Sequence, residues 1–202
     1  MSAVAKVAVL HLRTVAPYRT QALLVLGLMT LILARTPAGL VPALALLLAP
    51  LVAVQPFVVA DKSGLDTLYA VLPVPRRALV LGHYAWALAS FLATAGTGTA
   101  LALLLTRAEG TPFAGRTLAT ALTLSWALFA LNIAIQLPLL LRYGYARTSV
   151  LGTTLPLALV MVAAVRLHLT LTALHAWLPL LWAAGAAVLL LSLTLATRIS
   201  RR

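Results

Sequence analysis

The chain of 202 residues has no cysteine and little charge. The absence of cysteine excludes disulfides and thiolate chemistry. Only 9% of the residues are charged, against roughly 25% in ordinary globular domains, whereas 63% are hydrophobic. A chain with so little polar surface cannot cover itself in water, and this composition excludes a soluble enzyme.

Acidic residues are scarce, and none lies inside a long apolar run. The only ones are Asp61, Asp66 and Glu109. Ion-coupled carriers usually keep an ionisable group within the membrane, where it binds and releases the coupling ion. The sequence therefore argues against a carboxylate-coupled carrier. The histidines lack a cluster of acidic or cysteine ligands around them, so no metal site is predicted.

Phosphate-binding loops are absent as well. Such a loop needs Gly-Lys followed by Ser or Thr, but Lys6 follows Ala5 and Lys62 follows Asp61. We therefore expect no ATP binding by this chain, no cofactor within it and no catalytic residue.

What the chain does contain is a series of apolar runs bounded by charge. A helix of about 20 apolar residues crosses a bilayer and satisfies its own backbone hydrogen bonds. The first run has a basic flank, as a secretory signal peptide has, but no small-x-small cleavage site precedes Arg35. We predict an all-α integral membrane protein with one domain over 1–202 and six transmembrane helices, at about 18–34, 40–59, 78–105, 117–141, 149–165 and 176–196.

The basic residues predict the orientation, because Lys and Arg accumulate in cytoplasmic loops. With the N-terminus inside, only Arg35, Arg107, Arg116 and Arg166 fall in outer loops. The cytoplasmic segments then hold Lys6, Arg13, Arg19, Lys62, Arg76, Arg77, Arg142, Arg147, Arg198, Arg201 and Arg202. Both termini are therefore predicted to be cytoplasmic. The net charge of +12 follows from this asymmetry and from anionic lipid, so it does not indicate nucleic acid.

Two short segments outside the spans are amphipathic. Over 63–72, Ser63 can cap a helix whose apolar face would carry Leu65, Leu68, Tyr69 and Leu72, and Pro73 would end it. Such a face can be buried in lipid headgroups or in a partner protein. Over 4–17, Lys6 and Arg13 lie on one side and Ala8, Leu12 and Val15 on the other, which predicts an interfacial helix, with an extension of the first span as the alternative.

Polar and small residues inside the spans indicate close helix contacts or a pathway. Asn132 and Gln136 are four residues apart on one predicted helix face, and Gln55 precedes Pro56. An amide in hydrocarbon needs a partner or a wet cavity, so both helix packing and substrate contact remain open. The run from Ala93 to Ala100, with its two glycines, predicts close approach of a neighbouring backbone.

The loop after the second predicted span and the start of the next span contain Asp61, Gly64, Leu72 to Arg77, Val80 and Gly82-His83-Tyr84. This combination resembles the ABC-2-type permeases of bacterial ABC exporters, in particular the compact six-span group similar to the phenol-soluble-modulin and antibiotic-export permeases. That family has an acidic residue, a segment with glycine, a helix ending in Leu-Pro-Val, an arginine, and Gly-Lys-Tyr in the next span. This chain has His83 in place of that Lys.

Two further segments carry the resemblance across nearly the whole chain. Leu137-Pro138-Leu139 with Arg142-Tyr143-Gly144-Tyr145 resembles the loop that follows the fourth span in this family. Residues 6–18 resemble its N-terminal interfacial segment, although the aspartate usual near 9–11 is missing here.

The resemblance implies a division of labour. Two permease subunits, identical or homologous, would form the translocation pathway, and separate cytoplasmic ABC ATPase subunits would bind Mg-ATP. Helix 63–72 would dock into the ATPase, and the Arg142 to Arg147 loop would add a smaller contact. The implied coupling residues are Ser63, Gly64, Leu65, Asp66, Leu68, Tyr69, Leu72, Pro73, Arg142, Tyr143, Gly144 and Tyr145.

The expected location is the inner (cytoplasmic) membrane of a bacterium, with several passes in contact with lipid. A membrane anchor without transport activity and a carrier driven by an ion gradient are the alternative functions. The substrate stays open among peptide, lipid and hydrophobic drug, because all three suit an apolar cavity with few charges.

Overall fold

The structure is a computed structural model that describes residues 3–33, 37–64, 75–110, 115–145 and 177–199. Every secondary-structure element in these ranges is a helix, as expected for an all-α membrane protein. Four of the described helices are long and apolar enough to cross a membrane: Leu40–Ser63, Arg76–Ala108, Gly115–Tyr143 and Leu178–Arg198. The predicted fifth span, 149–165, lies outside the described residues, so the total of six spans stays a prediction.

The N-terminal part consists of two helices with a bend between them. Helix α1 covers Ala3–Val15, a short 3₁₀ helix covers Ala16–Tyr18 and contains Pro17, and α2 covers Arg19–Ile32. Helix α2 has 14 residues, fewer than the about 20 that a crossing requires. The status of 18–34 as the first span is therefore still a prediction.

The second predicted span is longer than expected and irregular. It consists of α3 (Pro37–Ala43), a π-helical turn (Leu44–Leu48) and α4 (Ala49–Ser63). In the π turn, the N–H of Ala49 donates to the carbonyl of Leu44, five residues back. Pro50 follows directly, and a proline ring collides with the carbonyl four residues before it. The wider turn is a known way to accommodate such a break.

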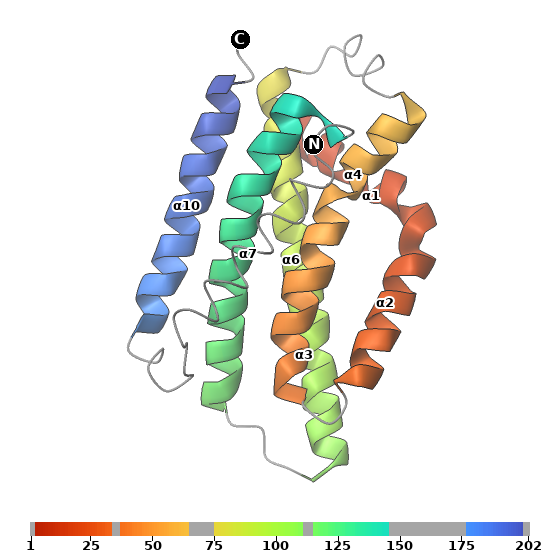
Figure 1. Cartoon of the computed structure of the whole chain (residues 1–202), viewed down its shortest axis with the longest axis vertical. Helices are drawn as coiled ribbons and strands as arrows, with labels where there is room; N and C mark the ends of the chain where they lie inside the picture. Colours follow the sequence, from red (N-terminus) through yellow and green to blue (C-terminus); the bar gives the residue numbers. More distant parts are fainter. Residues whose placement is uncertain (1–2, 34–36, 65–74, 111–114, 146–176, 200–202) are drawn as a thin grey trace.

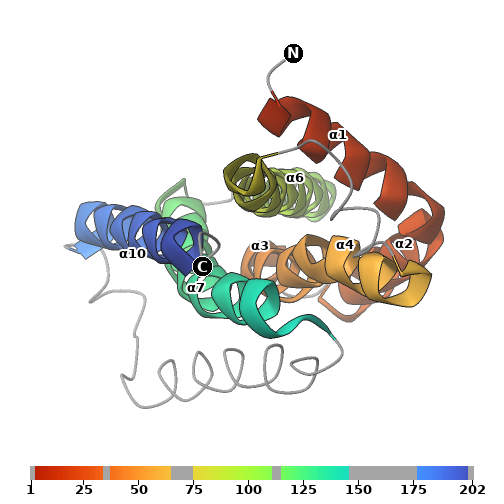
Figure 2. The ribbon, with the colours of Figure 1, turned by 90° about the horizontal axis from the view of Figure 1, so that it is seen from above.

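Three long helices complete the described fold: α6 (Arg76–Ala108), α7 (Gly115–Tyr143) and α10 (Leu178–Ile199). Figure 1 shows them running roughly along the long axis of the molecule beside α3 and α4. Seen from above in Figure 2, α7 lies between α10 and the α3–α4 pair, while α1 and α2 lie at the opposite side of the bundle. Each of the three is longer than the corresponding predicted span.

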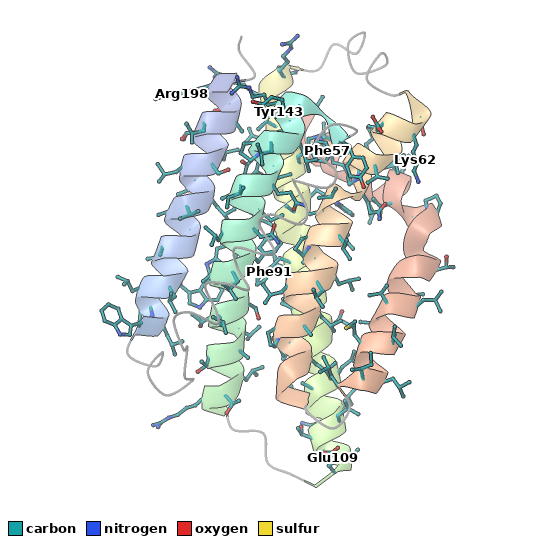
Figure 3. The ribbon with its side chains drawn as sticks, viewed as in Figure 1. Phe57, Lys62, Phe91, Glu109, Tyr143 and Arg198 are labelled. Atoms are coloured by element: carbon teal, nitrogen blue, oxygen red, sulfur yellow. The ribbon has the colours of Figure 1, made fainter. Side chains whose placement is uncertain are left out.

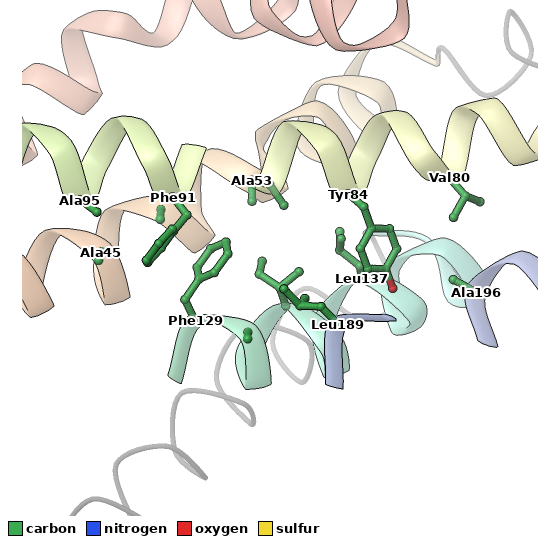
Figure 4. Packing of buried hydrophobic residues seen from close by; sticks show 14 residues of the cluster. Ala45, Ala53, Val80, Tyr84, Phe91, Ala95, Phe129, Leu137, Leu189 and Ala196 are labelled. Atoms are coloured by element: carbon green, nitrogen blue, oxygen red, sulfur yellow. The ribbon is translucent and has the colours of Figure 1, made fainter. Parts of the chain in front are cut away.

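The core lies where α6, α7 and α10 meet the second span. Phe91 and Phe129 pack with their ring centroids 4.7 Å apart, and Leu137, Tyr84 and Leu189 extend the same cluster along the bundle (Figure 4). Lipid tails are as apolar as leucine, so close packing and hydrogen bonds between helices hold a membrane bundle together. The cluster supplies the packing part of this stabilisation.

Close approach of helix backbones depends on one of the two glycines in the small-residue run. A Cβ built at Gly98 would lie 3.3 Å from the carbonyl oxygen of Leu40 and 3.3 Å from the Cα of Val41. The predicted close approach is therefore confirmed at Gly98, where α6 meets α3. At Gly96 a Cβ would meet no described residue within 4 Å, so the contact of this run depends on Gly98.

A proline inside a helix frees the carbonyl oxygen four residues before it, and at Pro56 and Pro138 a neighbouring helix supplies the missing donor. Pro56 has no N–H for the carbonyl of Val52, and the indole Nε1 of Trp86 donates to that oxygen at 3.0 Å. A buried carbonyl in lipid must find a partner, so this bond joins α6 firmly to α4.

The same arrangement recurs at the second of these prolines. Pro138 has no N–H for the carbonyl of Ala134, and the hydroxyl of Ser192 donates to it at 2.8 Å. Because the Ser192 proton is used in this way, the hydroxyl of Tyr84 donates to Ser192 Oγ, 2.6 Å away. One short chain of hydrogen bonds thus connects α6, α10 and α7.

Candidate functional site

Charged and aromatic side chains gather at one end of the bundle. In Figure 3, Lys62 near the end of α4, Tyr143 at the end of α7 and Arg198 on α10 lie at the same end, and Glu109 lies at the opposite end. Arg76 is the first residue of α6, so it belongs to the end that carries Lys62. The end of α4, from which the predicted coupling segment starts, and the end of α7, which carries the second predicted contact, thus lie at the same end of the bundle.

That end contains an open cleft of about 710 Å³, here called the end cleft. Its lining includes Asp61 of α4, Arg76 of α6, Arg142 and Tyr143 of α7, and Ala196 of α10. The guanidinium carbon of Arg142 lies 5.2 Å from the centroid of the Tyr143 ring, within the range of a cation–π contact. Cationic, anionic and aromatic groups are thus all available to a partner at this surface.

The predicted coupling helix is described only at its edges. Ser63 is the last residue of α4, and Gly64 follows with a positive φ of 62°, donating its N–H to the carbonyl of Ala60. A left-handed glycine in this position is a common way to end a helix. Pro75 then precedes α6 and accepts a hydrogen bond from the N–H of Ala78. Leu65, Asp66, Leu68, Tyr69, Leu72 and Pro73 lie outside the described residues.

The second predicted contact, Arg142 to Tyr145, is described, whereas Arg147 is not. Arg142 and Tyr143 are exposed at the end of α7. Gly144 has a φ of 75° and donates its N–H to the carbonyl of Leu140 at 2.9 Å, which ends α7. Tyr145 comes next and is half-buried. The sequence Arg-Tyr-Gly-Tyr therefore exposes its first two residues and directs the last one inward.

The three amides singled out from the sequence line a single cavity. This cavity of about 270 Å³, here called the polar cavity, lies between α4 and α7 and contains Gln55, Asn132, Gln136 and Tyr145. The rest of its lining is leucine, valine and proline. Asn132 is 3% exposed and Gln136 2%, and among the described residues no partner lies within hydrogen-bond distance of Asn132 Oδ1 or Gln136 Oε1.

Tyr145 lines both the end cleft and the polar cavity. A force on the exposed Arg142–Tyr143 pair therefore acts two residues away from a side chain in the cavity wall. One residue thus belongs to the walls of both the exposed cleft and the polar cavity.

A stack of three rings was not anticipated from the sequence. His83 of α6 lies between His11 of α1 and Phe57 of α4, with ring centroids 4.4 Å and 4.2 Å away. Both histidines are buried, and burial lowers the pKa of His11 to about 4. We call these three residues the ring stack. It fixes α1 against the start of α6.

The packing side of α1 also differs from its predicted apolar face. Val7 and His11 are buried, one turn apart, and a Cβ on Gly82 of α6 would collide with the side chain of Val7. Leu12, from the predicted apolar face, is 58% exposed, as a side facing lipid would be. The i, i+4 spacing of Val7 and His11 was the signal that could have revealed the second face.

Candidate metal ligands are dispersed in the part of the chain that the structure describes. Within it, no group of three or more His, Cys, Asp and Glu side chains is placed to hold a metal ion.

Comparisons with known proteins identify the family. Residues 11–201 match the family model described as ABC-2 family transporter protein. The comparison with curated proteins and the comparison with solved structures give no match. The family match covers nearly the whole chain and agrees with the resemblance found around the 61–84 and 137–145 segments. With its four long apolar helices, the chain is a multi-pass membrane protein and a permease component of an ABC transporter, and it belongs to the ABC-2 family of transporter proteins.

Proposed function

We propose that this chain is the permease subunit of an ATP-driven exporter in the inner membrane of a bacterium. It has six spans, both termini in the cytoplasm and a second permease subunit beside it. Separate cytoplasmic ATPase subunits bind Mg-ATP and hydrolyse it. The observation that supports this proposal is the end cleft, which is lined by Arg142 to Tyr145 of the second predicted contact and by Asp61 and Arg76, the described residues close to the ends of segment 63–72.

Charge supports the assignment of that end to the cytoplasm. The helix ends around the cleft carry Lys62, Arg76, Arg77, Arg142 and Arg198. The opposite ends of α6 and α7 carry Arg107 and Arg116, together with Glu109. A cytoplasmic surface is richer in Lys and Arg, so this distribution favours the cleft facing inward.

The helices that meet at the cleft can transmit a conformational change of the ATPase into the membrane. A force on residues 63–72 acts on the end of α4 and on the start of α6, which runs for 33 residues. The bond from Trp86 to the carbonyl of Val52 couples these two helices, so they move together. A second push on Arg142 and Tyr143 reaches Tyr145 and the polar cavity. The two contacts act on opposite walls of that cavity, α4 and α7.

Large apolar surfaces remain for lipid and for the second permease subunit. Leu24 and Leu31 of α2 are 73% and 76% exposed, and Leu190 and Leu191 of α10 are 62% and 64% exposed. Such faces are stable in hydrocarbon and not in water. They support a place within a larger membrane unit.

The coupling role is tested with paired variants of the whole transporter. Arg142→Glu reverses a charge in the end cleft, and Arg107→Glu makes the same change on an exposed arginine at the opposite end of the bundle. Leu68→Asp places a charge on the predicted apolar face of helix 63–72. Recovery of the ATPase in a pull-down and ATP-dependent export are measured for each, beside membrane insertion.

We expect Arg142→Glu and Leu68→Asp to reduce both ATPase recovery and export, and Arg107→Glu to leave both unchanged. Burying one large apolar side chain contributes about 1.5–3 kcal/mol, so the Leu68 change should weaken docking by at least tenfold. Equal ATPase recovery by all three variants with normal export would remove the end cleft from the coupling role. Export without any ATPase, driven by an ion gradient, would refute the exporter assignment.

A further inference from the structure

The polar cavity offers hydrogen bonds but no charge. Among the described residues, its polar lining consists of three amides and one tyrosine, and no Lys, Arg, His, Asp or Glu contributes to the wall. An ion entering it would lose its water and find no opposite charge, which is strongly unfavourable in a medium of low dielectric. The chemistry of the wall therefore selects against anions and cations alike.

Two of the amides are buried without a partner, unlike other polar groups of the same helix. Ser125 of α7 donates to the carbonyl of Ala121 at 2.6 Å, and Thr123 donates to that of Ala119 at 2.8 Å. The oxygens of Asn132 and Gln136 accept no hydrogen bond from any described residue. An amide retained only for helix packing would bond to a neighbouring helix. These two oxygens, one turn apart on residues that line the cavity, are buried acceptors that no described donor uses.

We propose that the polar cavity binds an uncharged, mainly apolar molecule that carries an amide or hydroxyl group, as the transported substrate or as one group of a larger substrate. This inference rests on the proposed role of the chain as a permease. A plain hydrocarbon tail would leave both amide oxygens unpaired, which is costly for buried acceptors. A ligand N–H or O–H pairs with those oxygens, and the leucine, valine and proline lining contacts the remainder.

The dimensions of the cavity limit what it can hold. At about 270 Å³ it lies just below the roughly 300–1,000 Å³ typical of sites for drug-sized ligands. A single aromatic or branched aliphatic group with one amide or hydroxyl fits this space. Gln55 on the opposing wall is half-buried and adds a third amide to the recognition of such a group.

The test measures binding to the full chain in lipid nanodiscs without any ATPase. The probe is tritiated 4-phenylbutanamide, a neutral amide with one apolar ring. Two unlabelled competitors share its skeleton: the N,N-dimethyl amide has no donor, and 4-phenylbutyrate carries a negative charge. Gln136→Met and Asn132→Leu remove each amide at similar volume. Ser125→Ala is the matched control on α7, because Ser125 lies outside the cavity and bonds within its own helix.

We expect saturable binding of the amide, with both competitors at least about tenfold weaker than the unlabelled amide, the effect of one lost hydrogen bond to a buried acceptor. Gln136→Met and Asn132→Leu should each weaken binding about tenfold, and Ser125→Ala should not. If a cavity variant fails to fold, the competitor series on the unchanged chain decides the question alone. Equal competition by the carboxylate, or undiminished binding by both folded cavity variants, overturns the inference.

Failure of this inference is distinguishable from failure of the proposed function. Binding is measured on the permease chain alone, whereas coupling is measured by ATPase recovery and export. If the chain does not discriminate the amide from its competitors but still recovers the ATPase and exports, only the binding site is refuted. If it does discriminate them but has no ATPase partner, the exporter role is refuted and the binding site is supported.

Discussion

Acidification should release α1 from α6, because His11 is buried in the ring stack as a neutral ring. Its pKa is lowered from 6.5 to about 4 by burial. When α1 is undocked, His11 is in water and takes up a proton below pH 6.5; when docked, it does so only near pH 4. Between these values the undocked state binds more protons, so docking weakens as the pH falls through this window and is unaffected above it.

The magnitude follows from the two pKa values. Each pH unit of difference is worth about 1.36 kcal/mol, so docking of α1 loses about 2 kcal/mol at pH 5 and about 3 kcal/mol at pH 4, relative to pH 7.5. At pH 5 this corresponds to an approximately 30-fold larger undocked population. Among the described residues, His83 is the titratable group in ring contact with His11.

The assay is amide hydrogen exchange of the Ala3–Val15 segment, followed by mass spectrometry and corrected for the intrinsic pH dependence of exchange. Protection should fall by about 30-fold from pH 7.5 to pH 5. His11→Phe keeps a ring in the stack without a titrating group, so its protection should not change over this range. Constant protection in the unchanged chain, or the same loss in the His11→Phe variant, would refute the assignment to His11.

Three further predictions concern packing and chemistry. Ser192→Ala should destabilise the bundle by about 1–3 kcal/mol in thermal unfolding, because the carbonyl freed by Pro138 loses its donor. Adding Pro138→Ala should recover part of this loss by supplying a backbone N–H, and no recovery would contradict the assignment of this hydrogen bond. Gly98→Leu should lower the free energy of unfolding by about 1–3 kcal/mol and so lower the melting temperature, whereas Gly96→Leu should leave stability unchanged or raise it. Equal effects of the two substitutions would contradict the α3–α6 contact. The purified chain alone should hydrolyse no ATP, since neither lysine follows a glycine; hydrolysis by a preparation free of other ATPases would contradict this.

Hydropathy predicted where the long helices lie, because a bilayer imposes the same length and apolar character on every crossing helix. Helices α6 and α7 cover the spans expected at 78–105 and 117–141 and extend beyond both ends by two or three residues, whereas α10 begins two residues later and ends three residues later than the span expected at 176–196. Arginines at those ends, such as Arg76 and Arg142, lie in helical turns that the apolar pattern assigned to loops. A long side chain can reach the aqueous phase from within a helix, so charge marks the membrane boundary better than it marks the helix end.

The contacts between helices could not be predicted in the same way. Gln55, Asn132 and Gln136 were identified as unusual residues, but only the structure brings them to one cavity. The ring stack joins α1, α4 and α6, and no local periodicity reveals which helices become neighbours. The donors from Trp86 and Ser192 illustrate the same limit. A proline in the sequence indicates that a carbonyl is left without its helical donor, but the residue that donates to that carbonyl lies 34 or 58 positions away from it along the chain.

The central claim is that the end cleft faces the cytoplasm and holds the ATPase. It is tested most directly by a photo-crosslinking residue placed at Tyr143, with the same residue at Glu109 as the opposite-end control, in cells that produce the whole transporter. We expect irradiation to join the chain to an ATP-binding subunit from position 143 and not from position 109. A crosslink to that subunit from position 109, or none from position 143 in an assembled and active transporter, would contradict the account.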